Sequence, residues 1–286
     1  MAGPAAATVS TTDDERIAFI LDDKRFWVPY PEANEAMKLM KEMRAAPRET
    51  RPLNLAIIGP PSSGKSQLLR VFAERNTPPY DPNEDNPTLP VLRIDMPEAP
   101  EQASFVRELL AGIGAHYSTR EPVDELVRRL TVFSTSLGIE LFVVDEFHNG
   151  FKGTKRQQDI LLNLTRGISS RTGVPIAIAG IDKVENFLKA DPQLSTRFRR
   201  LHLPVWKENE ATLMFLKTFE QKLGLKERSQ LATTPLRSLI LRLTGGATGQ
   251  ICRLLRSSAV VAIRNGTEKI TEVILEDRAH YLPRET

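Results

Sequence analysis

Apolar residues cluster in five short runs, and stretches with helical spacing separate these runs. Short continuous apolar runs that end in turn residues are typical of strands buried on both faces. Because helical segments lie between them, the runs predict a parallel sheet covered by helices on both sides. The predicted strands are residues 53–58, 91–95, 139–144, 175–180 and 201–205.

Apolar residues at helical spacing predict helices in the segments between these strands. Phe105, Leu109 and Ile113, for example, lie four apart and indicate one helical face. The same criterion predicts helices over residues 32–46, 65–72, 105–113, 123–133, 156–173 and 183–190.

The pattern changes after Trp206, where only helical periods follow, in residues 208–224, 233–245, 249–266 and 271–282. We therefore predict an α/β domain over residues 25–206 and a small helical lid domain over residues 207–286. Residues 1–24 are expected to form a disordered N-terminal arm.

Composition changes this picture in one stretch only. Lys and Arg number 39 against 36 Asp and Glu, and a net charge of +3 does not identify an anionic partner. Residues 228–267, however, contain six arginines and no Asp or Glu. This stretch is either a solvated helical face or a surface for phosphate groups or an acidic partner.

Cysteines and long apolar runs are scarce, which excludes several classes of protein. The single cysteine, Cys252, rules out an intramolecular disulfide and a thiolate zinc site. The four histidines lack metal-ligand spacing. No run approaches the ~18 apolar residues of a transmembrane helix, and the N-terminus lacks a secretory signal pattern. We expect a cytoplasmic protein without a membrane partner.

Residues 59–66, GPPSSGKS, match the phosphate-loop pattern G-x-x-x-x-G-K-[ST] without a gap. The loop follows a predicted strand and opens a predicted helix, as the pattern requires. Its backbone N–H groups and the helix N-terminus suit phosphate oxygens, Lys65 suits the β- and γ-phosphates, and Ser66 suits Mg²⁺. The predicted nucleotide ligands are Gly59, Pro60, Pro61, Ser62, Ser63, Gly64, Lys65, Ser66 and Gln67.

Two carboxylates, Asp145 and Glu146, end the apolar run LFVV. The carboxyl ends of parallel strands form the ligand-binding edge of an open α/β sheet. Asp145 is therefore a candidate for supporting Mg²⁺ together with Ser66. Glu146 is a candidate for orienting and deprotonating the water that attacks the γ-phosphate. The alternative is a charged strand end that only begins a loop.

Arginines near the last predicted strand are candidates for a role in catalysis. Arg197, Arg199 and Arg200 precede it, and an arginine supplied by a second subunit can stabilise charge on the transferring phosphoryl group. The alternative is a basic patch at the edge of the sheet. Arg253, at the start of a helix in the second domain, is a candidate for coupling that domain to the nucleotide.

One expected feature is missing at the end of residues 175–180. In nucleotide-hydrolysing sheets of this kind, a polar residue usually ends the strand between the two phosphate-side strands. Here Gly180 and Ile181 stand at this position, and a polar side chain follows only at Asp182. Either Asp182 substitutes, or a residue such as Asn149 polarises the water.

Taken together, these motifs resemble an AAA+ ATPase, and most closely the TniB/TnsC-type ATPases of transposons. The resemblance rests on FWVPYPEANEAM ahead of the phosphate loop, on DEFHN, on STRFRRLHLPVW and on TGGATGQICRLL. It covers approximately residues 25–275. It implies the AAA+ P-loop ATPase fold, with a five-stranded parallel sheet, flanking helices and a small C-terminal helical lid.

The resemblance also implies a function and roles for particular residues. The protein would oligomerise with ATP on double-stranded DNA, as a ring or helical filament, and connect a DDE transposase to a TniQ-like target-selection factor. ATP hydrolysis would drive disassembly. Arg197 becomes the trans-acting arginine and Arg253 a lid sensor. Trp27, Val28 and Tyr30 become candidates for the adenine side, although such a cluster near a helix start is more often core packing.

DNA contact is predicted for the short basic segment FKGTKRQQ, through Lys152, Lys155 and Arg156. Aromatic residues do not alternate with these cations, so we expect contacts to phosphates and not to bases. A solvated loop is the alternative, and Arg107 and the lid arginines are other candidates for DNA contact.

Two rival functions fit the same motifs. One is another AAA+ ATPase that remodels DNA, such as a helicase or clamp loader. The other is a nucleotide-sensing scaffold with little hydrolysis, which the unusual Gly180-Ile181 position would allow.

Overall fold

A five-stranded parallel sheet forms the centre of one of the two units of the structure. The structure, a computed structural model, describes residues 12–79, 87–98, 101–190 and 196–277. One unit is Pro31–Val205, and the other combines the described parts of Met1–Tyr30 and Trp206–Thr286. The helical unit therefore begins one residue earlier than expected, and it also includes residues 25–30, which we had placed in the α/β domain.

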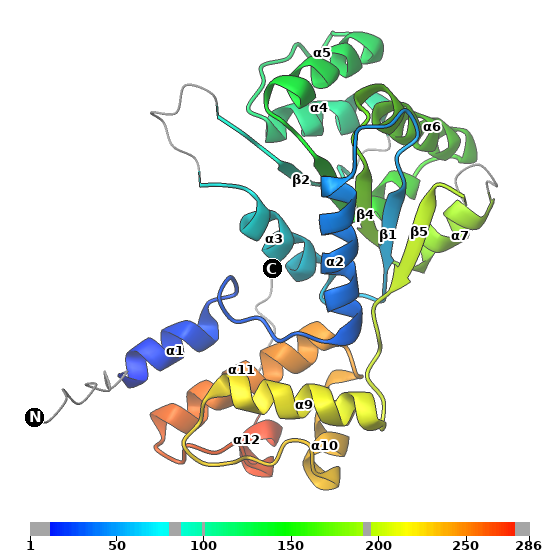
Figure 1. The fold of residues 1–286 in the computed structure, drawn as a ribbon. Helices are drawn as coiled ribbons and strands as arrows, with labels where there is room; N and C mark the ends of the chain where they lie inside the picture. Colours follow the sequence, from blue (N-terminus) through cyan, green and yellow to red (C-terminus); the bar gives the residue numbers. More distant parts are fainter. Residues whose placement is uncertain (1–11, 80–86, 99–100, 191–195, 278–286) are drawn as a thin grey trace, which may run out of the picture. The chain divides into compact units, whose positions relative to one another are not determined.

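The strand order is β2-β3-β4-β1-β5, and every pairing is parallel, as predicted. β4 lies between β1 and β3. The labelled strands β4, β1 and β5 follow one another in this order in Figure 1. The loop after β1 and the carboxylates at the end of β3 are therefore at the same edge of the sheet, one strand apart. The strands are β1 (Asn54–Ile58), β2 (Val91–Asp95), β3 (Leu141–Asp145), β4 (Ile176–Gly180) and β5 (Phe198–His202).

The last strand begins three residues earlier than the predicted 201–205. Phe198 and Leu201 are buried, whereas Arg199, between them, is exposed. β5 is an edge strand, and such strands carry charged side chains that discourage pairing with another chain. The predicted boundary was wrong because the run FRRLH contains charges and does not read as a buried strand.

Helices cover both faces of the sheet (Figure 1). Alternate residues such as Ala56, Phe142 and Ile178 belong to a core shared with α4–α7, while α2 and α3 pack on the other face. The elements of this unit are α2 (Pro31–Ala45), α3 (Lys65–Asn76), α4 (Gln102–Gly112), α5 (Val123–Ser136), η1 (Phe147–Phe151), α6 (Lys155–Thr172) and α7 (Asp182–Ala190).

The second unit is helical, and it contains part of the segment that we expected to be a disordered arm. Thr12 and Glu15 form a reciprocal capping box that starts α1, which is a stable way to begin a helix. Residues 1–11 and 278–286 lie outside the described residues. The helices of this unit are α1 (Asp13–Leu21), α9 (Glu210–Leu223), α10 (Thr234–Thr244), α11 (Thr248–Arg264) and α12 (Glu272–Glu276).

Aromatic packing explains why residues 25–30 belong to this unit. The ring of Tyr30 meets those of Trp206 and Phe215 edge-on, at centroid distances of 5.5 and 5.9 Å. Trp206 and Phe215 are stacked 4.3 Å apart, and Phe26 lies 5.4 Å from Phe219. Large aromatic side chains dominate the energetics of a small core. This core holds the segment before α2.

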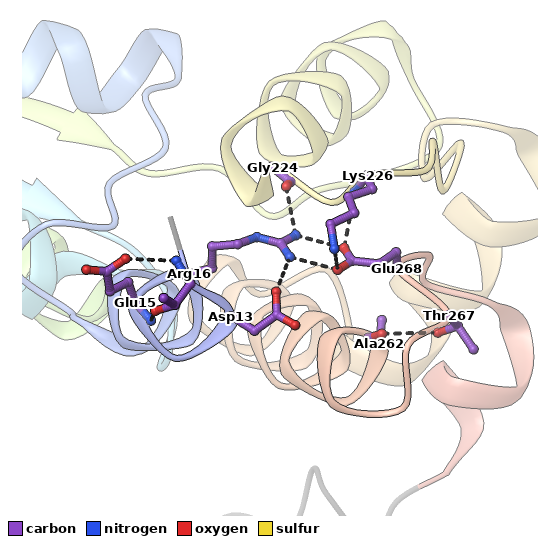
Figure 2. A network of polar contacts seen from close by, with 9 residues as sticks. Asp13, Glu15, Arg16, Gly224, Lys226, Ala262, Thr267 and Glu268 are labelled. Carbon is purple, nitrogen blue, oxygen red and sulfur yellow. Dashed lines mark hydrogen bonds and ion pairs between the residues drawn. The ribbon is translucent and has the colours of Figure 1, made fainter. Parts of the chain in front are cut away.

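A buried ion pair connects α1 to the loop before α12 (Figure 2). The guanidinium of Arg16 donates to both carboxylate oxygens of Glu268 at 2.7 Å, and Lys226 approaches the same carboxylate at 3.0 Å. Arg16 also donates to the carbonyl of Gly224. The Arg16 and Lys226 hydrogen bonds lower the pKa of Glu268 to about 2. The side chain of Glu268 is only 9% exposed. Removing one member of the ion pair therefore leaves a buried charge without its partner.

We expect Glu268→Gln to lower the free energy of unfolding of this unit by about 2 kcal/mol at pH 7. The folded pKa of Glu268 is below its usual value of 4.5, so the wild-type contribution is present above pH 4.5. It is lost as the pH falls toward 2. The difference between variant and wild type should therefore shrink over this range.

Urea unfolding followed by tryptophan fluorescence measures this effect, because both tryptophans, Trp27 and Trp206, lie in this unit. Asp13→Asn is the matched control, since Asp13 also contacts Arg16 but is 56% exposed. It should cost less than about 0.5 kcal/mol. Equal losses in the two variants, or a difference independent of pH, would contradict the prediction.

None of the described helices is long and apolar enough to span a membrane.

Candidate nucleotide site

The phosphate loop is packed too tightly for any larger residue at its first position. A Cβ on Gly59 would lie 2.6 Å from the hydroxyl oxygen of Ser63 and 3.3 Å from Cβ of Leu203. The N–H of Gly59 donates to the carbonyl of Gly180 at 3.2 Å, which connects the loop to the end of β4. Glycine is therefore required here for space.

Two residues of the loop have left-handed backbone conformations. Ser62 has φ +58° and Gly64 has φ +91°, and Gly64 directly precedes α3. The first N–H groups of an α-helix have no acceptor within the helix. The amides of Lys65, Ser66 and Gln67 are thus at the positive end of α3, where anions bind.

Lys65 lies folded over its own loop. Its ammonium donates to the carbonyls of Gly59 and Pro60 at 2.8 Å each and approaches the hydroxyl of Ser63 at 3.3 Å. Burial lowers the pKa of Lys65, and the negative charges of Glu146, Asp145 and Asp182 oppose this shift. Oxygens of the loop itself thus accept the hydrogen bonds of Lys65.

Asp145, the last residue of β3, is buried, and its side chain is 1% exposed. One carboxylate oxygen accepts the N–H of Glu146 at 2.8 Å, and the other lies 3.4 Å from the guanidinium of Arg93. An ionised carboxylate survives such burial only with partners of this kind. The sheet therefore holds an oxygen ligand in one orientation at the edge that carries the phosphate loop.

Glu146 differs from Asp145 in exposure and in backbone. Its side chain is 43% exposed, and its φ of +50° is in the left-handed region, which is uncommon for residues other than glycine. This turn separates the two carboxylates, with one buried in the sheet and one accessible. Strained backbone of this kind is found preferentially at functional sites.

His148 is the polar residue nearest to Glu146 that the sequence analysis missed. Its Nε2 lies 3.3 Å from a carboxylate oxygen of Glu146. The two residues are two positions apart in DEFHN, but only the short helix η1 brings their side chains together. The signal in the sequence that could have identified His148 is its position two residues after Glu146.

The two residues that we considered for polarising the water have different surroundings. The side-chain amide of Asn149 donates to the carbonyl of Met96 at 3.4 Å, toward β2. Asp182 is exposed and begins α7.

Arg197 lies at the amino-terminal end of β1, whereas the phosphate loop follows the carboxyl-terminal end of the same strand. Its carbonyl accepts the N–H of Asn54, the first residue of β1, at 2.8 Å. Its guanidinium lies 3.3 Å from the hydroxyl of Ser170 in α6. The loop follows the other end of β1, about 13 Å away at 3.3 Å per residue. Arg197 therefore cannot reach the phosphate loop of its own chain.

A family model described as "Bacterial TniB protein" matches residues 16–208. The chain belongs to the TniB family. The match includes the phosphate loop, the acidic strand end and Arg197. No curated protein sequence matches the chain at a significant level.

Solved structures similar to this TniB-family chain share its fold. The ORC2 protein of Aeropyrum pernix, in ADPNP–ADP complexes, is 16% identical with a TM-score of 0.61, covering 90% of this chain and 69% of that one. Cdc6p of Pyrobaculum aerophilum is 17% identical with a TM-score of 0.57, covering 87% and 68%. The ORC1 protein of Aeropyrum pernix in complex with DNA is 18% identical with a TM-score of 0.58, covering 91% and 67%. The fold is that of an AAA+ P-loop ATPase, as predicted.

The basic segment that we proposed for DNA contact is partly paired within the chain. Lys152 lies 3.6 Å from Glu98, and Lys155 lies 2.7 Å from Asp159 and 4.5 Å from the ring centroid of Phe187. Arg156 is exposed. Exposed ion pairs of this kind are weak, so a phosphate group can replace the carboxylates.

The arginines of residues 228–267 are also partly paired, with acids from outside that stretch. Arg237 lies 2.5 Å from Glu208, Arg242 lies 3.4 Å from Glu276, and Arg256 contacts Asp23. Half of the six arginines therefore neutralise nearby carboxylates, which weakens the interpretation of the stretch as one phosphate-binding surface.

The remaining candidates of this TniB-family protein lie in the helical unit. Tyr30 and Val28 are buried in it, and Trp27 is half-buried. Arg253 is exposed in the second turn of α11. The buried positions of Val28 and Tyr30 favour core packing, and any contact of these residues with a nucleotide stays a prediction.

Proposed function

We propose that this TniB-family protein is an ATP-hydrolysing regulator of DNA transposition in the cytoplasm. In this proposal it assembles on target DNA when ATP is bound, and it recruits or activates a DDE transposase. A TniQ-like target-selection factor directs it, and hydrolysis dismantles the assembly. Family membership and the AAA+ fold support an ATPase that acts on DNA, and the chemistry of the site supports hydrolysis.

The residues at the carboxyl edge of the sheet suit Mg·ATP. The cradle at Gly59 and the amides at the start of α3 suit phosphate oxygens, and Lys65 would exchange carbonyls for them. The hydroxyl of Ser66 and the buried carboxylate of Asp145 are oxygen donors for Mg²⁺. Among the described residues, no three His, Cys, Asp or Glu side chains could hold a metal by themselves. This agrees with an ion held jointly by a carboxylate and phosphates. Bound Mg²⁺ would neutralise charge on the phosphates.

Glu146 is the proposed general base. Its carboxylate is accessible and adjacent to the residue that supports Mg²⁺. It would take a proton from water while the water oxygen bonds to the γ-phosphorus and the bond to the ADP oxygen breaks. The products are ADP and inorganic phosphate.

The position of Arg197 is the observation that carries the assembly part of this proposal. Arg197 and the phosphate loop are at opposite ends of β1, so an Arg197 that acts on the transferring phosphoryl group must do so at the site of another copy. A head-to-tail contact of this kind makes each site from two chains, and it produces rings or helical filaments. We propose that Arg253 of the lid senses the nucleotide.

Mixing two inactive variants tests this proposal. We expect Lys65→Ala and Arg197→Ala each to lower kcat for ATP hydrolysis, Arg197→Ala by about 10³-fold. An equal mixture should recover about a quarter of wild-type activity, since one interface in four joins an intact Lys65 to an intact Arg197. Steady-state phosphate release measures both quantities.

The matched control for Arg197 is Arg171→Ala, an exposed arginine in the last turn of α6, next to Ser170. It should retain wild-type turnover. A mixture as inactive as its components would contradict the shared site.

Replacing Lys152, Lys155 and Arg156 together by Ala should weaken binding to duplex DNA of any sequence. Each lost phosphate contact should reduce the slope of log affinity against log salt by about 0.9. Fluorescence anisotropy with a labelled duplex and a slowly hydrolysed ATP analogue, at several salt concentrations, measures the slope. Lys38→Ala, an exposed lysine of α2 paired with Glu42, is the control. An unchanged slope would move DNA contact to another surface.

The rival function is a nucleotide-sensing scaffold with little turnover. The observation that favours it is Gly180 at the end of β4, where a polar side chain is usual in such ATPases.

A further inference from the structure

The end of β4 cannot contribute a side chain to the site. A Cβ on Gly180 would lie 2.5 Å from Cγ2 of Val184, so a residue with a side chain fits here only if Val184 or α7 shifts. The same Cβ would lie 3.6 Å from Nδ1 of His148. The imidazole of His148 therefore lies beside the position that a polar side chain at residue 180 would use.

His148 is held in this place by its neighbours in η1. Phe147 is fully buried, and Gly150 is so close to α6 that a Cβ there would lie 2.2 Å from Cδ2 of Leu161. The N–H of Asn149 donates to the carbonyl of Glu146 at 2.8 Å, which closes the turn. Phe147 before it and Gly150 two residues after it anchor the backbone of η1, and the ring of His148 lies beside Glu146.

The two ring nitrogens of His148 have different surroundings. Nε2 lies 3.3 Å from Oε2 of Glu146. Nδ1 is buried and has no hydrogen-bond partner among the residues that the structure describes. A buried polar atom without a partner is costly, and it is often completed by a water or a ligand in the working molecule.

We propose that His148 is the positioning residue for Glu146 in ATP hydrolysis, in place of a polar residue at the end of β4. This inference rests on the proposed ATPase function. In the tautomer that carries hydrogen on Nε2, the imidazole donates to Oε2 of Glu146 and leaves Oε1 to accept the proton of the attacking water. Nδ1 is then an acceptor for a second water at the end of β4. The 3.3 Å contact shortens when the substrate is bound, as contacts of catalytic groups commonly do.

Neither of the other two polar candidates can do this from its observed position. The amide of Asn149 donates to Met96 on the side of β2. Asp182 is exposed at the start of α7 and makes no hydrogen bond with Glu146 in the described part of the chain.

Three variants of His148 separate positioning from a structural role. Gln places an amide nitrogen where Nε2 lies, Asn places one only where Nδ1 lies, and Ala places none. We expect His148→Ala and His148→Asn to lower kcat by about 30-fold and His148→Gln by less than about 3-fold. The KM for ATP should change less than about threefold in all three, because the phosphate loop is untouched.

The control is His202→Ala. His202 ends β5 at the same edge of the sheet and also contacts a glutamate, Glu185, at 3.0 Å, but that glutamate belongs to α7. Its kcat should equal that of wild type. Thermal unfolding and the affinity for a fluorescent ADP analogue verify that each variant is folded.

A double variant tests whether His148 acts through Glu146. In a Glu146→Gln background, His148→Ala should cause no further loss of kcat, since the group that it positions is gone. Wild-type turnover in His148→Ala, equal losses in the Gln and Asn variants, or full additivity would each overturn the role of His148 while leaving the ATPase function intact. A wild-type protein that does not hydrolyse Mg·ATP would overturn the proposed function, and with it this role.

Discussion

Glu146→Gln should lower kcat for Mg·ATP hydrolysis by about 10²–10⁴-fold and change nucleotide affinity by less than about threefold. Glutamine keeps the shape and the contact with His148 but cannot accept the proton of the attacking water. The left-handed backbone of residue 146 is equally accessible to both residues, so folding should not change. Phosphate release under saturating ATP and titration with a fluorescent nucleotide measure the two effects.

Glu140→Gln is the matched control for this prediction. Glu140 directly precedes β3, at the other end of the strand, and its carboxylate pairs with Arg44. Its kcat should equal the wild-type value. If Glu146→Gln hydrolyses ATP as fast as wild type, Glu146 is not the base, and the scaffold function gains support only if both rates are negligible.

Gly246→Ala should lower the free energy of unfolding of the helical unit by at least about 3 kcal/mol. A Cβ on Gly246 would lie 2.2 Å from the carbonyl oxygen of Trp206, which is part of the backbone and cannot rotate away. The φ of +71° adds a left-handed penalty. If Trp206 moved away to relieve this clash, it would lose two hydrogen bonds, one to the carbonyl of Gly246 and one to the hydroxyl of Thr248.

Gly245→Ala separates the two causes of this loss. Gly245 has φ +59°, but a Cβ there has no heavy atom within 4 Å, so only the backbone penalty of about 1–2 kcal/mol should remain. Urea unfolding followed by tryptophan fluorescence reports directly on this unit. Losses of equal size in the two variants would show that the contact with Trp206 costs nothing.

The phosphate loop and the acidic strand end could be located from the sequence because each depends on a short, continuous segment. Gly59 and Gly64 are required by the path of the backbone itself, through close contact at one and positive φ at the other. Asp145 and Glu146 follow an apolar run that can only be a buried strand. The AAA+ fold and the TniB family were both confirmed. The chemical roles of these residues stay predictions until the variants are measured.

The edges and ends of the structure were harder to predict. β5 carries Arg199 and Arg200 between the buried Phe198 and Leu201, so its pattern does not resemble that of the central strands. α1 lies in the segment of residues 1–24 that we expected to be a disordered arm. It is held in place by Arg16, whose partner Glu268 is 252 residues away in the chain. Sequence patterns carry no information about a contact at such separation.

The sequence by itself determined the fold class, the family and the nucleotide-binding segments, because local backbone geometry and apolar periodicity depend on neighbouring residues. Only the tertiary structure decided that Arg197 and the phosphate loop lie at opposite ends of β1. It also decided that His148 lies where β4 has no side chain to offer. Both facts follow from the strand order and from the space between packed elements. Contacts between residues distant in the chain determine the strand order and this space.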